Sequence, residues 1–203
     1  MCKTFYIIDD HEMLRVGTSG WITSNSAWKC CGSAGTHEQA FADFERMTEL
    51  PAVLICDLNF YGENTGFDFM SKIHNLYPEV KIIVYSMFFA AGIVQSAVSS
   101  GASGYVSKNA SCAELLEGME KVLAGEVFIQ EELKPNLKKY NSFTDALTRR
   151  EKEVMELLIR RYSNDEIANQ LGIKKRAVEN YISLIYEKTG VNDRNELLLR
   201  YGQ

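Results

Sequence analysis

The chain has 203 residues, of which 46% are hydrophobic and 24% charged. This composition is close to that of ordinary globular proteins and excludes a disordered tail, a collagen-like repeat and a disulfide-dense miniprotein. Residues 1–143 carry 11 basic and 17 acidic side chains (net −6), whereas residues 144–203 carry 11 and 10 (net +1). This asymmetry suggests two domains with different partners.

Two segments bear on location. The longest nearly apolar run, 82–94, is shorter than the roughly 18 residues that suggest a membrane span. The apolar stretch before Asp9 is too short for a secretory signal. We therefore expect a cytoplasmic protein with no membrane partner.

The cysteines fit that location. They are odd in number, lack C-x-x-C spacing and lie mostly in apolar stretches: Cys2, Cys30, Cys31, Cys56 and Cys112. We expect buried, reduced thiols rather than a metal or redox site.

The first part of the chain alternates short apolar runs with segments of helical spacing. The apolar runs are residues 4–8, 28–31, 52–56, 81–85 and 104–106. Two S/T-x-x-E/Q patterns, starting at Thr36 and Ser111, read as capping boxes at helix starts. Five strand–helix units predict an α/β doubly wound (βα)5 domain over residues 1–126, with a five-stranded parallel sheet.

The periodicity fades over residues 127–143, which contain Pro135 and a polar run. We interpret this segment as a linker. Residues 144–203 then predict a small all-α domain of four helices. Capping boxes at Thr148 and Ser163 start helices near 149–160 and 164–170. A third helix runs over about 174–188, and a fourth follows Asn192.

Polar side chains follow four of the predicted strands. They are Asp9, Asp10, Asp57, Ser86 and Lys108. In a doubly wound sheet these strand ends meet at one edge. Clustered carboxylates suit a hard cation, most plausibly Mg²⁺. The ion would hold a phosphoryl group in line with a nucleophilic carboxylate, while the lysine and hydroxyl bind the remaining phosphoryl oxygens.

Two other interpretations compete. Any single strand-end aspartate is commonly an ordinary helix cap, although the whole set favours a functional site. A haloacid-dehalogenase-type phosphatase would need a second aspartate two residues after Asp57, where this chain has Asn59.

Four segments resemble the receiver domain of bacterial two-component response regulators. They are residues 7–11, 54–58, 84–87 and 104–108. The resemblance covers about residues 3–124. It implies that Asp57 accepts phosphate from a histidine kinase and that Asp10 is the main Mg²⁺ ligand, with Asp9 nearby or acting through water. Asn59 would contribute its backbone carbonyl to the metal. Lys108 would contact the phosphoryl group, and Ser86 and Tyr105 would form the switch pair.

The loop after Asp57 departs from that pattern. Receivers usually have Met-Pro soon after the phosphorylated aspartate and a glycine eight residues beyond it. Here the segment contains Phe60-Tyr61, and Gly66 lies nine residues beyond Asp57. The departure concerns the shape of the loop and the lifetime of the phosphorylated form, not the nucleophile.

Ala168, Gly172 and Val178 have the spacing of a helix-turn-helix. Val178, Ile182 and Ile185 would face inward. The residues left facing outward are Lys174, Lys175, Arg176, Glu179, Asn180 and Ser183. The competing interpretation is a small helical bundle with a solvated, charged face.

Residues 147–154, 163–168, 178–181 and 188–191 resemble the LuxR-type output domain, so nearly the full chain resembles a NarL/FixJ-class transcriptional regulator. The resemblance implies that helix 174–188 enters the DNA major groove, with Glu179, Asn180 and Ser183 facing the bases. The candidates for phosphate contacts are Lys174, Lys175, Arg176 and Lys188. The last helix, around residues 197–199, would pair two copies on DNA, unless it only packs in the core.

Three positions of the third helix depart from the family. Glu179, Ala177 and Tyr181 stand where Lys, Thr and His are common, and each change removes a DNA contact or a positive charge. Glu179 can accept a hydrogen bond from cytosine N4 and Asn180 can bond adenine, so one interpretation is that the protein reads an unusual DNA sequence. The other interpretation is that its affinity for DNA is low and that dimerisation matters more.

These features predict a phosphorylation-switched, DNA-binding transcriptional regulator that acts as a homodimer on paired half-sites of duplex DNA. It is not a conventional enzyme, although a receiver catalyses its own phosphorylation and hydrolysis. One alternative is an atypical, phosphorylation-independent dimeric regulator. Another is a phosphate-relay or protein-interaction module that does not bind DNA.

Overall fold

The computed structural model describes residues 3–58 and 65–201. The chain forms two compact units. The first comprises Met1–Phe88 and Ala97–Gln130, and the second comprises Phe89–Ser96 and Glu131–Gln203. Among the described residues, no helix has both the length and the apolar character that crossing a bilayer requires.

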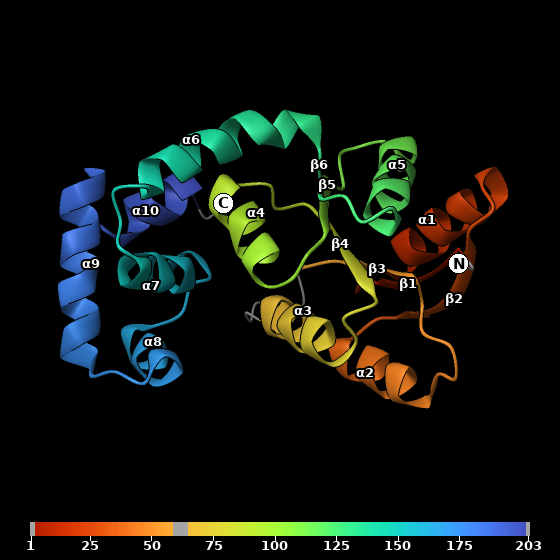
Figure 1. The fold of residues 1–203 in the computed structure, drawn as a ribbon, viewed down its shortest axis with the longest axis horizontal. Coiled ribbons are helices and arrows are strands. Elements are labelled where there is room, and N and C mark those ends of the chain that lie inside the picture. Colours follow the sequence, from red (N-terminus) through yellow and green to blue (C-terminus); the bar gives the residue numbers. More distant parts are fainter. Residues whose placement is uncertain (1–2, 59–64, 202–203) are drawn as a thin grey trace. The chain divides into compact units, whose positions relative to one another are not determined.

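The first unit contains the sheet (Figure 1). Its strands are β1 (Thr4–Ile8), β2 (Lys29–Ala34), β3 (Val53–Cys56), β4 (Lys81–Ser86), β5 (Gly104–Ser107) and β6 (Phe128–Ile129). Its helices are α1 (Glu12–Asn25), α2 (His37–Arg46), α3 (Thr65–Leu76), the end of α4 (Ala91–Ser99) and α5 (Cys112–Leu123).

The sheet is parallel throughout, in the order β2-β1-β3-β4-β5-β6. The doubly wound arrangement and its first five strands are confirmed, but the sheet has six strands rather than five. The sixth, Phe128–Ile129, lies in the segment that the sequence predicts to be a linker. A two-residue strand has no periodicity to detect, and it forms only because Gly104 and Tyr105 of β5 offer it a partner.

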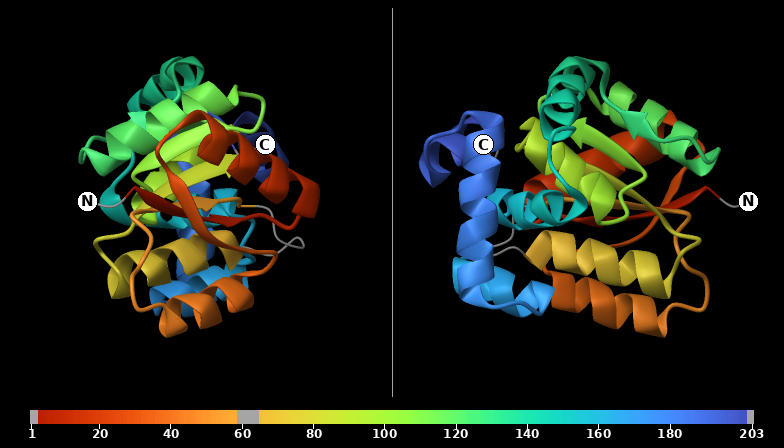
Figure 2. Two further views of the ribbon diagram at one scale, coloured as in Figure 1. Left: turned by 90° about the vertical axis from the view of Figure 1, so that its right-hand side faces the viewer. Right: turned by 60° about the vertical axis from the view of Figure 1, so that its left-hand side comes forward.

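Helices cover both faces of this sheet. Figures 1 and 2 show α1 and α5 together on one face and α2 beside α3 on the other. Every residue of β3 and β5 is buried, as parallel strands covered on both faces require. The core between the sheet and α1/α5 includes Phe5, Ile7, Trp28, Ile55, Val106 and Met119.

The capping prediction for α5 is confirmed, since Ser111 and Glu114 each bond the other's backbone N–H. At α2 only half of the box forms. Thr36 accepts from the N–H of Gln39, but the Gln39 side chain accepts from the N–H of Gly35 at 3.3 Å. The Gln39 side chain thus bonds the Gly35 N–H instead of the Thr36 N–H that a capping box requires.

The cysteine prediction is wrong for two thiols. Cys56 is buried, but Cys30 and Cys31 are exposed. Both lie on β2, the edge strand, where one side of the strand has no neighbouring strand to cover it. Although Cys31 is exposed, partial desolvation of its thiol raises the pKa to about 11, which leaves it a poor nucleophile.

The second unit begins with the segment Phe89–Ser96, which follows β4, and its remaining residues are mostly helical. It contains the 3₁₀ turn η1 (Glu131–Leu133) and the helices α6 (Lys134–Thr144), α7 (Arg149–Ile159), α8 (Asn164–Leu171), α9 (Lys175–Thr189) and α10 (Arg194–Tyr201). The segment expected to be an irregular linker is therefore mostly α6. Pro135 lies in its first turn, where proline favours rather than breaks a helix, and Tyr140 and Thr144 are buried on one face.

The four helices predicted for the end of the chain all form. Thr148 and Ser163 begin α7 and α8 with complete capping boxes. Gly172 ends α8 in the left-handed conformation (φ 64°), which glycine adopts without steric strain. Val178 and Ile185 are fully buried on α9, while Ile182 between them is only half-buried.

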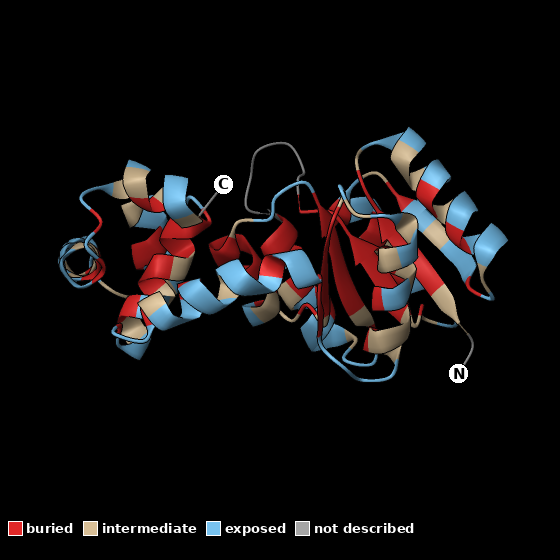
Figure 3. Cartoon of the chain, turned by 90° about the horizontal axis from the view of Figure 1, so that it is seen from above, coloured by how far each residue is buried: buried red, intermediate tan, exposed pale blue. Residues whose placement is uncertain are grey.

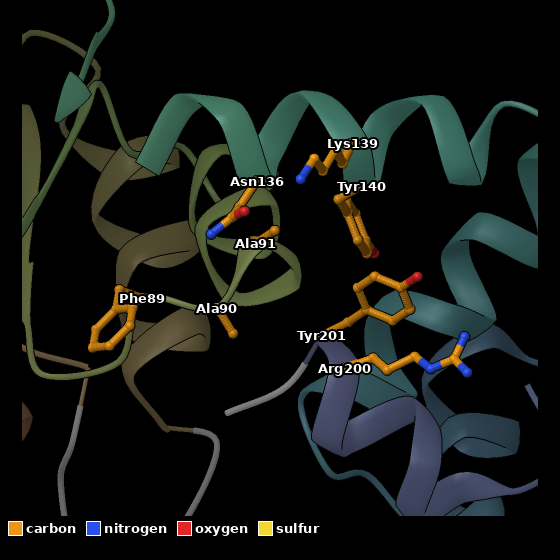
Figure 4. A pocket seen from close by; sticks show the side chains of 8 residues that line it. All are labelled: Phe89, Ala90, Ala91, Asn136, Lys139, Tyr140, Arg200 and Tyr201. Carbon is orange, nitrogen blue, oxygen red and sulfur yellow. The ribbon is translucent and has the colours of Figure 1, made fainter. Parts of the chain in front are cut away.

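The second unit also holds a shallow cavity of about 430 Å³ (Figure 4). Its lining is Phe89, Ala90, Ala91, Asn136, Lys139, Tyr140, Arg200 and Tyr201. The Tyr140 and Tyr201 rings lie edge to face with their centroids 5.3 Å apart. None of the predicted site residues lines this cavity.

Candidate functional site

The structure brings three predicted residues into direct contact at the carboxyl edge of the sheet. Lys108 Nζ lies 2.6 Å from Asp9 Oδ2 and 2.5 Å from Asp57 Oδ2. The three side chains are nearly inaccessible to solvent, with exposures of 5% for Lys108 and 2% for each aspartate. Two carboxylates are therefore held around one ammonium group in a buried site.

Backbone hydrogen bonds past the strand ends fix this arrangement. The N–H of Asp57 donates to the carbonyl of Ile8 at 3.0 Å, and the N–H of Lys108 donates to that of Ser86 at 2.9 Å. The site residues thus continue the parallel ladder beyond the last strand residues. Their side chains emerge at one edge because β1, β3, β4 and β5 are consecutive in the sheet.

Burial dominates the electrostatics of Asp57. It raises the pKa of this carboxyl above its ordinary value, and the nearby Asp9 acts in the same direction. Hydrogen bonds from Lys108 and Ser86 oppose the increase in pKa. The carboxyl is thus costly to ionise but is stabilised as an anion by a lysine on one side, as a poised nucleophile requires.

The pKa of Lys108 depends on Asp57 and Asp9. Burial alone would lower the pKa of its ammonium group, but hydrogen bonds to Asp57 and Asp9 outweigh burial, so its pKa is raised. Lys108 is therefore held as a cation, which can neutralise charge on a bound anionic group.

The potential metal ligands beside Lys108 and Asp57 fit a hard divalent cation. Asp10 Oδ1 is buried and lies 2.7 Å from His11 Nδ1. Ligand atoms of Asp9, Asp10 and His11 all lie within 4.8 Å of one another. Two carboxylates this close together form an oxygen-rich position that suits a hard cation. The sequence reasoning assigned no role to His11.

The loop after Asp57 is only partly described. Asn59, the predicted carbonyl ligand, and Phe60-Tyr61 lie outside the described residues. Gly66 is described, and its backbone lies close to that of Leu58. A Cβ on Gly66 would sit 2.9 Å from the Leu58 carbonyl oxygen. This close approach accounts for a glycine nine residues beyond Asp57.

Ser86 and Tyr105 meet through the backbone of Phe88. Ser86 is fully buried at the end of β4, and the Phe88 N–H lies 3.4 Å from its Oγ. The Tyr105 hydroxyl donates to the Phe88 carbonyl, and its ring is fully buried. Burial raises the pKa of the Tyr105 phenol, which keeps it a donor. The backbone of one residue, Phe88, thus connects both predicted switch residues.

Gln130 is a residue that the sequence reasoning missed. It follows β6 and is 3% exposed. Its Oε1 accepts from the N–H of Ser107 at 2.9 Å, and its own N–H donates to the carbonyl of Tyr105 at 3.0 Å. It therefore holds the backbone just before Lys108. The available signal was a polar residue directly after the apolar pair Phe128-Ile129.

On α9, the predicted DNA-facing residues are exposed. They are Lys174, Lys175, Arg176, Glu179, Asn180 and Ser183. Two of them have partners within the unit: Lys175 Nζ lies 2.8 Å from Asp165 Oδ2, and the Ser183 hydroxyl donates to the Glu179 carbonyl at 3.1 Å. Their contacts with DNA stay predictions.

Lys188 lies in a different environment from these residues. Its Nζ donates to both carboxylate oxygens of Glu151, at 2.8 and 2.7 Å. Glu151 is 3% exposed and belongs to the capping box of α7. The hydrogen bond from Lys188 is the main reason that the pKa of Glu151 is lowered. Lys188 thus contributes to the packing of α9 against α7, while its own side chain stays partly exposed and its contact with DNA stays a prediction.

Comparison with known families agrees with both parts of the chain. The family model of the response regulator receiver domain matches residues 5–120. The model of the luxR family of bacterial regulatory proteins matches residues 145–200.

Two curated relatives match this chain over most of its length. The transcriptional activator protein ExaE of Pseudomonas putida is 30% identical over 200 residues, covering 95% of this chain and 92% of ExaE. The response regulator protein VraR of Staphylococcus aureus is 26% identical, with coverage of 95% and 92%.

Solved structures show the same fold. RcsB of Salmonella enterica serovar Typhimurium, bound to the rprA promoter in the presence of a phosphomimetic, is 20% identical, with a TM-score of 0.70 and full coverage of both chains. A structure of two RcsB dimers bound to two parallel DNAs is 21% identical, with a TM-score of 0.69 over 98% of each chain. This chain therefore belongs to the response regulators that join a receiver domain to a LuxR-type domain, the NarL/FixJ class.

Proposed function

We propose that the protein is a transcriptional regulator whose binding to duplex DNA is switched by phosphorylation of Asp57. The observation that carries this proposal is the buried Lys108 ammonium bridging Asp9 and Asp57, with Ser86 on the neighbouring strand. A sensor histidine kinase is the proposed phosphodonor, and the receiver would occupy residues 1–126.

The chemistry follows from the placement of the groups. A carboxylate oxygen of Asp57 attacks phosphorus, the bond from phosphorus to the donor breaks, and the donor leaves with that electron pair. Asp9, Asp10 and Asp57, with the Asn59 carbonyl, would hold a Mg²⁺ ion, which would supply charge neutralisation. Lys108 is freed from Asp57 to pair with a phosphoryl oxygen. The chain thus promotes its own modification but transforms no separate substrate.

The switch would use the backbone of Phe88, which both Ser86 and Tyr105 contact. When Ser86 bonds a new phosphoryl oxygen, the segment at Phe88 must adjust, because its N–H and its carbonyl contact Ser86 and Tyr105 respectively. A local charge change is thereby converted into movement of the segment that follows β4.

The proposed output is the exposed face of α9, in a DNA-binding domain over residues 144–203 after the segment 127–143. Lys174, Lys175 and Arg176 would contact phosphates, and Glu179 and Asn180 would read base edges. Two copies would bind paired half-sites. DNA as the target implies that the protein acts in the cytoplasm.

The first test is the intact mass of the full chain after incubation with Mg²⁺ and a small-molecule phosphodonor. We expect the mass to increase by one phosphoryl group in the natural chain and not in Asp57→Asn. If both proteins gain the group, the acceptor is another residue. If neither does, the phosphorylation-independent alternative is favoured.

The second test is the affinity for a library of duplex DNA, measured with the phosphorylated and unphosphorylated chain. We expect tighter, sequence-selective binding by the phosphorylated form. A chain that gains phosphate but binds no duplex in either form would be a relay or protein-interaction module.

A further inference from the structure

The cavity of about 430 Å³ lies wholly within the second unit. Its lining comes from three places in the chain: the segment that begins α4, the helix α6 and the end of α10. Pockets for small molecules typically have volumes of about 300–1,000 Å³. The function proposed above uses none of the lining residues. The cavity is therefore a candidate site for a small ligand that is distinct from DNA and from the phosphodonor.

Aromatic rings form one part of the lining. The Tyr201 ring contacts two rings of α6, with its centroid 5.3 Å from that of Tyr140 and 4.7 Å from that of Phe143. Figure 4 shows the Tyr140 and Tyr201 rings next to each other at the cavity. Burial raises the pKa of the Tyr140 phenol, so this ring stays uncharged. Rings held in this way offer a flat, apolar surface on which a planar ligand can stack.

Polar side chains form another part of the lining. Figure 4 shows the ammonium end of Lys139 on the same side as the amide of Asn136, away from the rings. Among the residues that the structure describes, no carboxylate forms an ion pair with Lys139. The wall near Asn136 is completed by the methyl groups of Ala90 and Ala91, which leave space open. The cavity thus has an ammonium group and an amide at one end.

The charge of the lining is opposite to that of the chain. The lining includes the cations Lys139 and Arg200 and no acid, whereas the chain has a net charge of −5. Arg200 is paired with Glu196 on its own helix, so Lys139 is the cation left for a ligand. Lys139 is exposed, and Figure 3 shows that the outward side of α6, the helix at the top of Figure 1, is largely exposed. A ligand can therefore reach Lys139 from solvent.

These features together match a ligand that is planar at one end and negatively charged at the other. We propose that the cavity binds a small aromatic anion. Its ring lies against Tyr140 and Tyr201, and its carboxylate or phosphate group accepts hydrogen bonds from Lys139 and Asn136. Carboxylate and phosphate share this chemistry, so the test separates them.

The position of the cavity in the chain connects its ligand with the switch, a connection that rests on the proposed function. Ala90 and Ala91 follow Phe88 closely, and the proposed switch moves the segment at Phe88. A ligand in the cavity stabilises the arrangement of this segment in which Lys108 is still bonded to Asp57. Because coupling between two sites is reciprocal, we expect the phosphorylated chain to bind the ligand more weakly.

The test is the affinity of the full, unphosphorylated chain for benzoate and for adenosine 5′-monophosphate, measured by ligand-observed magnetic resonance. Benzamide and adenosine are the matched uncharged probes, and cyclohexanecarboxylate keeps the charge of benzoate without its aromatic ring. Lys139→Met removes the cation, and Asn136→Asp adds a negative charge beside it. Lys138→Met is the matched control, because Lys138 is an exposed lysine of the same helix that does not line the cavity.

We expect at least one of the two aromatic anions to bind with a dissociation constant of about 1 mM or lower, and about tenfold more tightly than its uncharged counterpart. Binding of benzoate indicates a carboxylate ligand, and binding of adenosine 5′-monophosphate indicates a phosphate ligand. Lys139→Met and Asn136→Asp should each weaken binding by about tenfold, whereas Lys138→Met should bind like the natural chain. All three replaced side chains are exposed, so the melting temperature should not change.

Binding of neither anion would overturn the proposal. So would equal losses of affinity in Lys139→Met and Lys138→Met, or binding of cyclohexanecarboxylate as tight as that of benzoate. Equal affinity of the phosphorylated and unphosphorylated chains would overturn only the connection with the switch. The intact mass of each sample reports phosphorylation separately, so failure of the proposed function is distinguishable from failure of this site.

Discussion

At the scale of single residues, Asp57 illustrates how a nucleophile is prepared at a cost in stability. Its pKa is raised, chiefly by burial, so the folded chain holds the Asp57 proton more tightly than the unfolded chain does. Ionisation of Asp57 therefore destabilises the fold above its folded pKa, and this destabilisation is absent below the unfolded pKa. Asparagine is uncharged and has nearly the same shape as protonated aspartate, so Asp57→Asn lacks this destabilisation at every pH.

We accordingly expect Asp57→Asn to melt at a higher temperature than the natural chain at pH 7 in the presence of a chelator. The difference should shrink as the pH falls through the raised pKa toward that of an ordinary aspartate. Thermal melts at a series of pH values measure this. A difference that stays constant with pH would show that ionisation of Asp57 is not its source.

Lys188 and Arg176 are both basic residues on α9, but their environments differ. Lys188→Met leaves the buried Glu151 carboxylate without its ammonium partner, which should cost about 1–3 kcal/mol of stability. Arg176→Met removes an exposed side chain and should leave the melting temperature unchanged while weakening DNA binding across all sequences. Chemical denaturation and DNA titration of both variants check this. Equal stability of the two variants would contradict the structural role of Lys188.

Glu179 is the exposed acid among these basic side chains. If it accepts from cytosine N4, Glu179→Lys should remove about 1–3 kcal/mol of discrimination at one base pair and raise the affinity for DNA of any sequence. Selection of binding sites from a random library, compared for both proteins, measures both effects. Unchanged affinity and unchanged preference would exclude a role for Glu179 in DNA recognition.

At the scale of elements, β6 contributes more to the site than its two residues suggest. It pairs with β5 and places Gln130 against the backbone between Tyr105 and Lys108. The switch tyrosine and the site lysine thus depend on a strand from the far end of the domain. Gln130 is a positioning residue, since it bonds the backbone beside them.

Replacing Gln130 with alanine leaves the buried Ser107 N–H without an acceptor, at a cost of about 1–3 kcal/mol. We expect lower stability and slower gain of the phosphoryl group. Gln130→Glu keeps an acceptor oxygen and should restore much of both. Melting curves and the rate of mass gain test this. If Gln130→Ala is destabilised but phosphorylates at the natural rate, Gln130 supports the fold and not the site.

At the scale of the whole molecule, the near-neutral charge of residues 144–203 means that DNA binding depends on a few local cations. Lys174, Lys175 and Arg176 give three per copy and six per dimer, because the ion pair of Lys175 with Asp165 is exposed and exchanges readily, whereas Lys188 is held by the buried Glu151. Each neutralised phosphate contributes about −0.9 to the slope of log K against log salt. We expect a slope of about −5 for the dimer. A slope near −7 would mean that Lys188 also contacts DNA.

Features that depend on local pattern can be predicted from the residues alone. The five longer strands, the capping boxes of α5, α7 and α8 and the glycine that ends α8 follow from residues adjacent in the chain. The grouping of Asp9, Asp57 and Lys108 was also predictable, because strand ends of a doubly wound sheet share one edge whatever the details of packing.

Only the tertiary structure decided features that depend on distant partners. Phe128–Ile129 becomes a strand because β5 has a free edge, and Gln130 reaches the site as a result. Lys188 is engaged by Glu151, 37 positions away, although its local sequence resembles a DNA contact. Cys30 and Cys31 are exposed because β2 lies at the sheet edge. In each case burial or pairing depends on a residue that is adjacent in the fold but distant in the sequence. The local sequence pattern does not identify that residue.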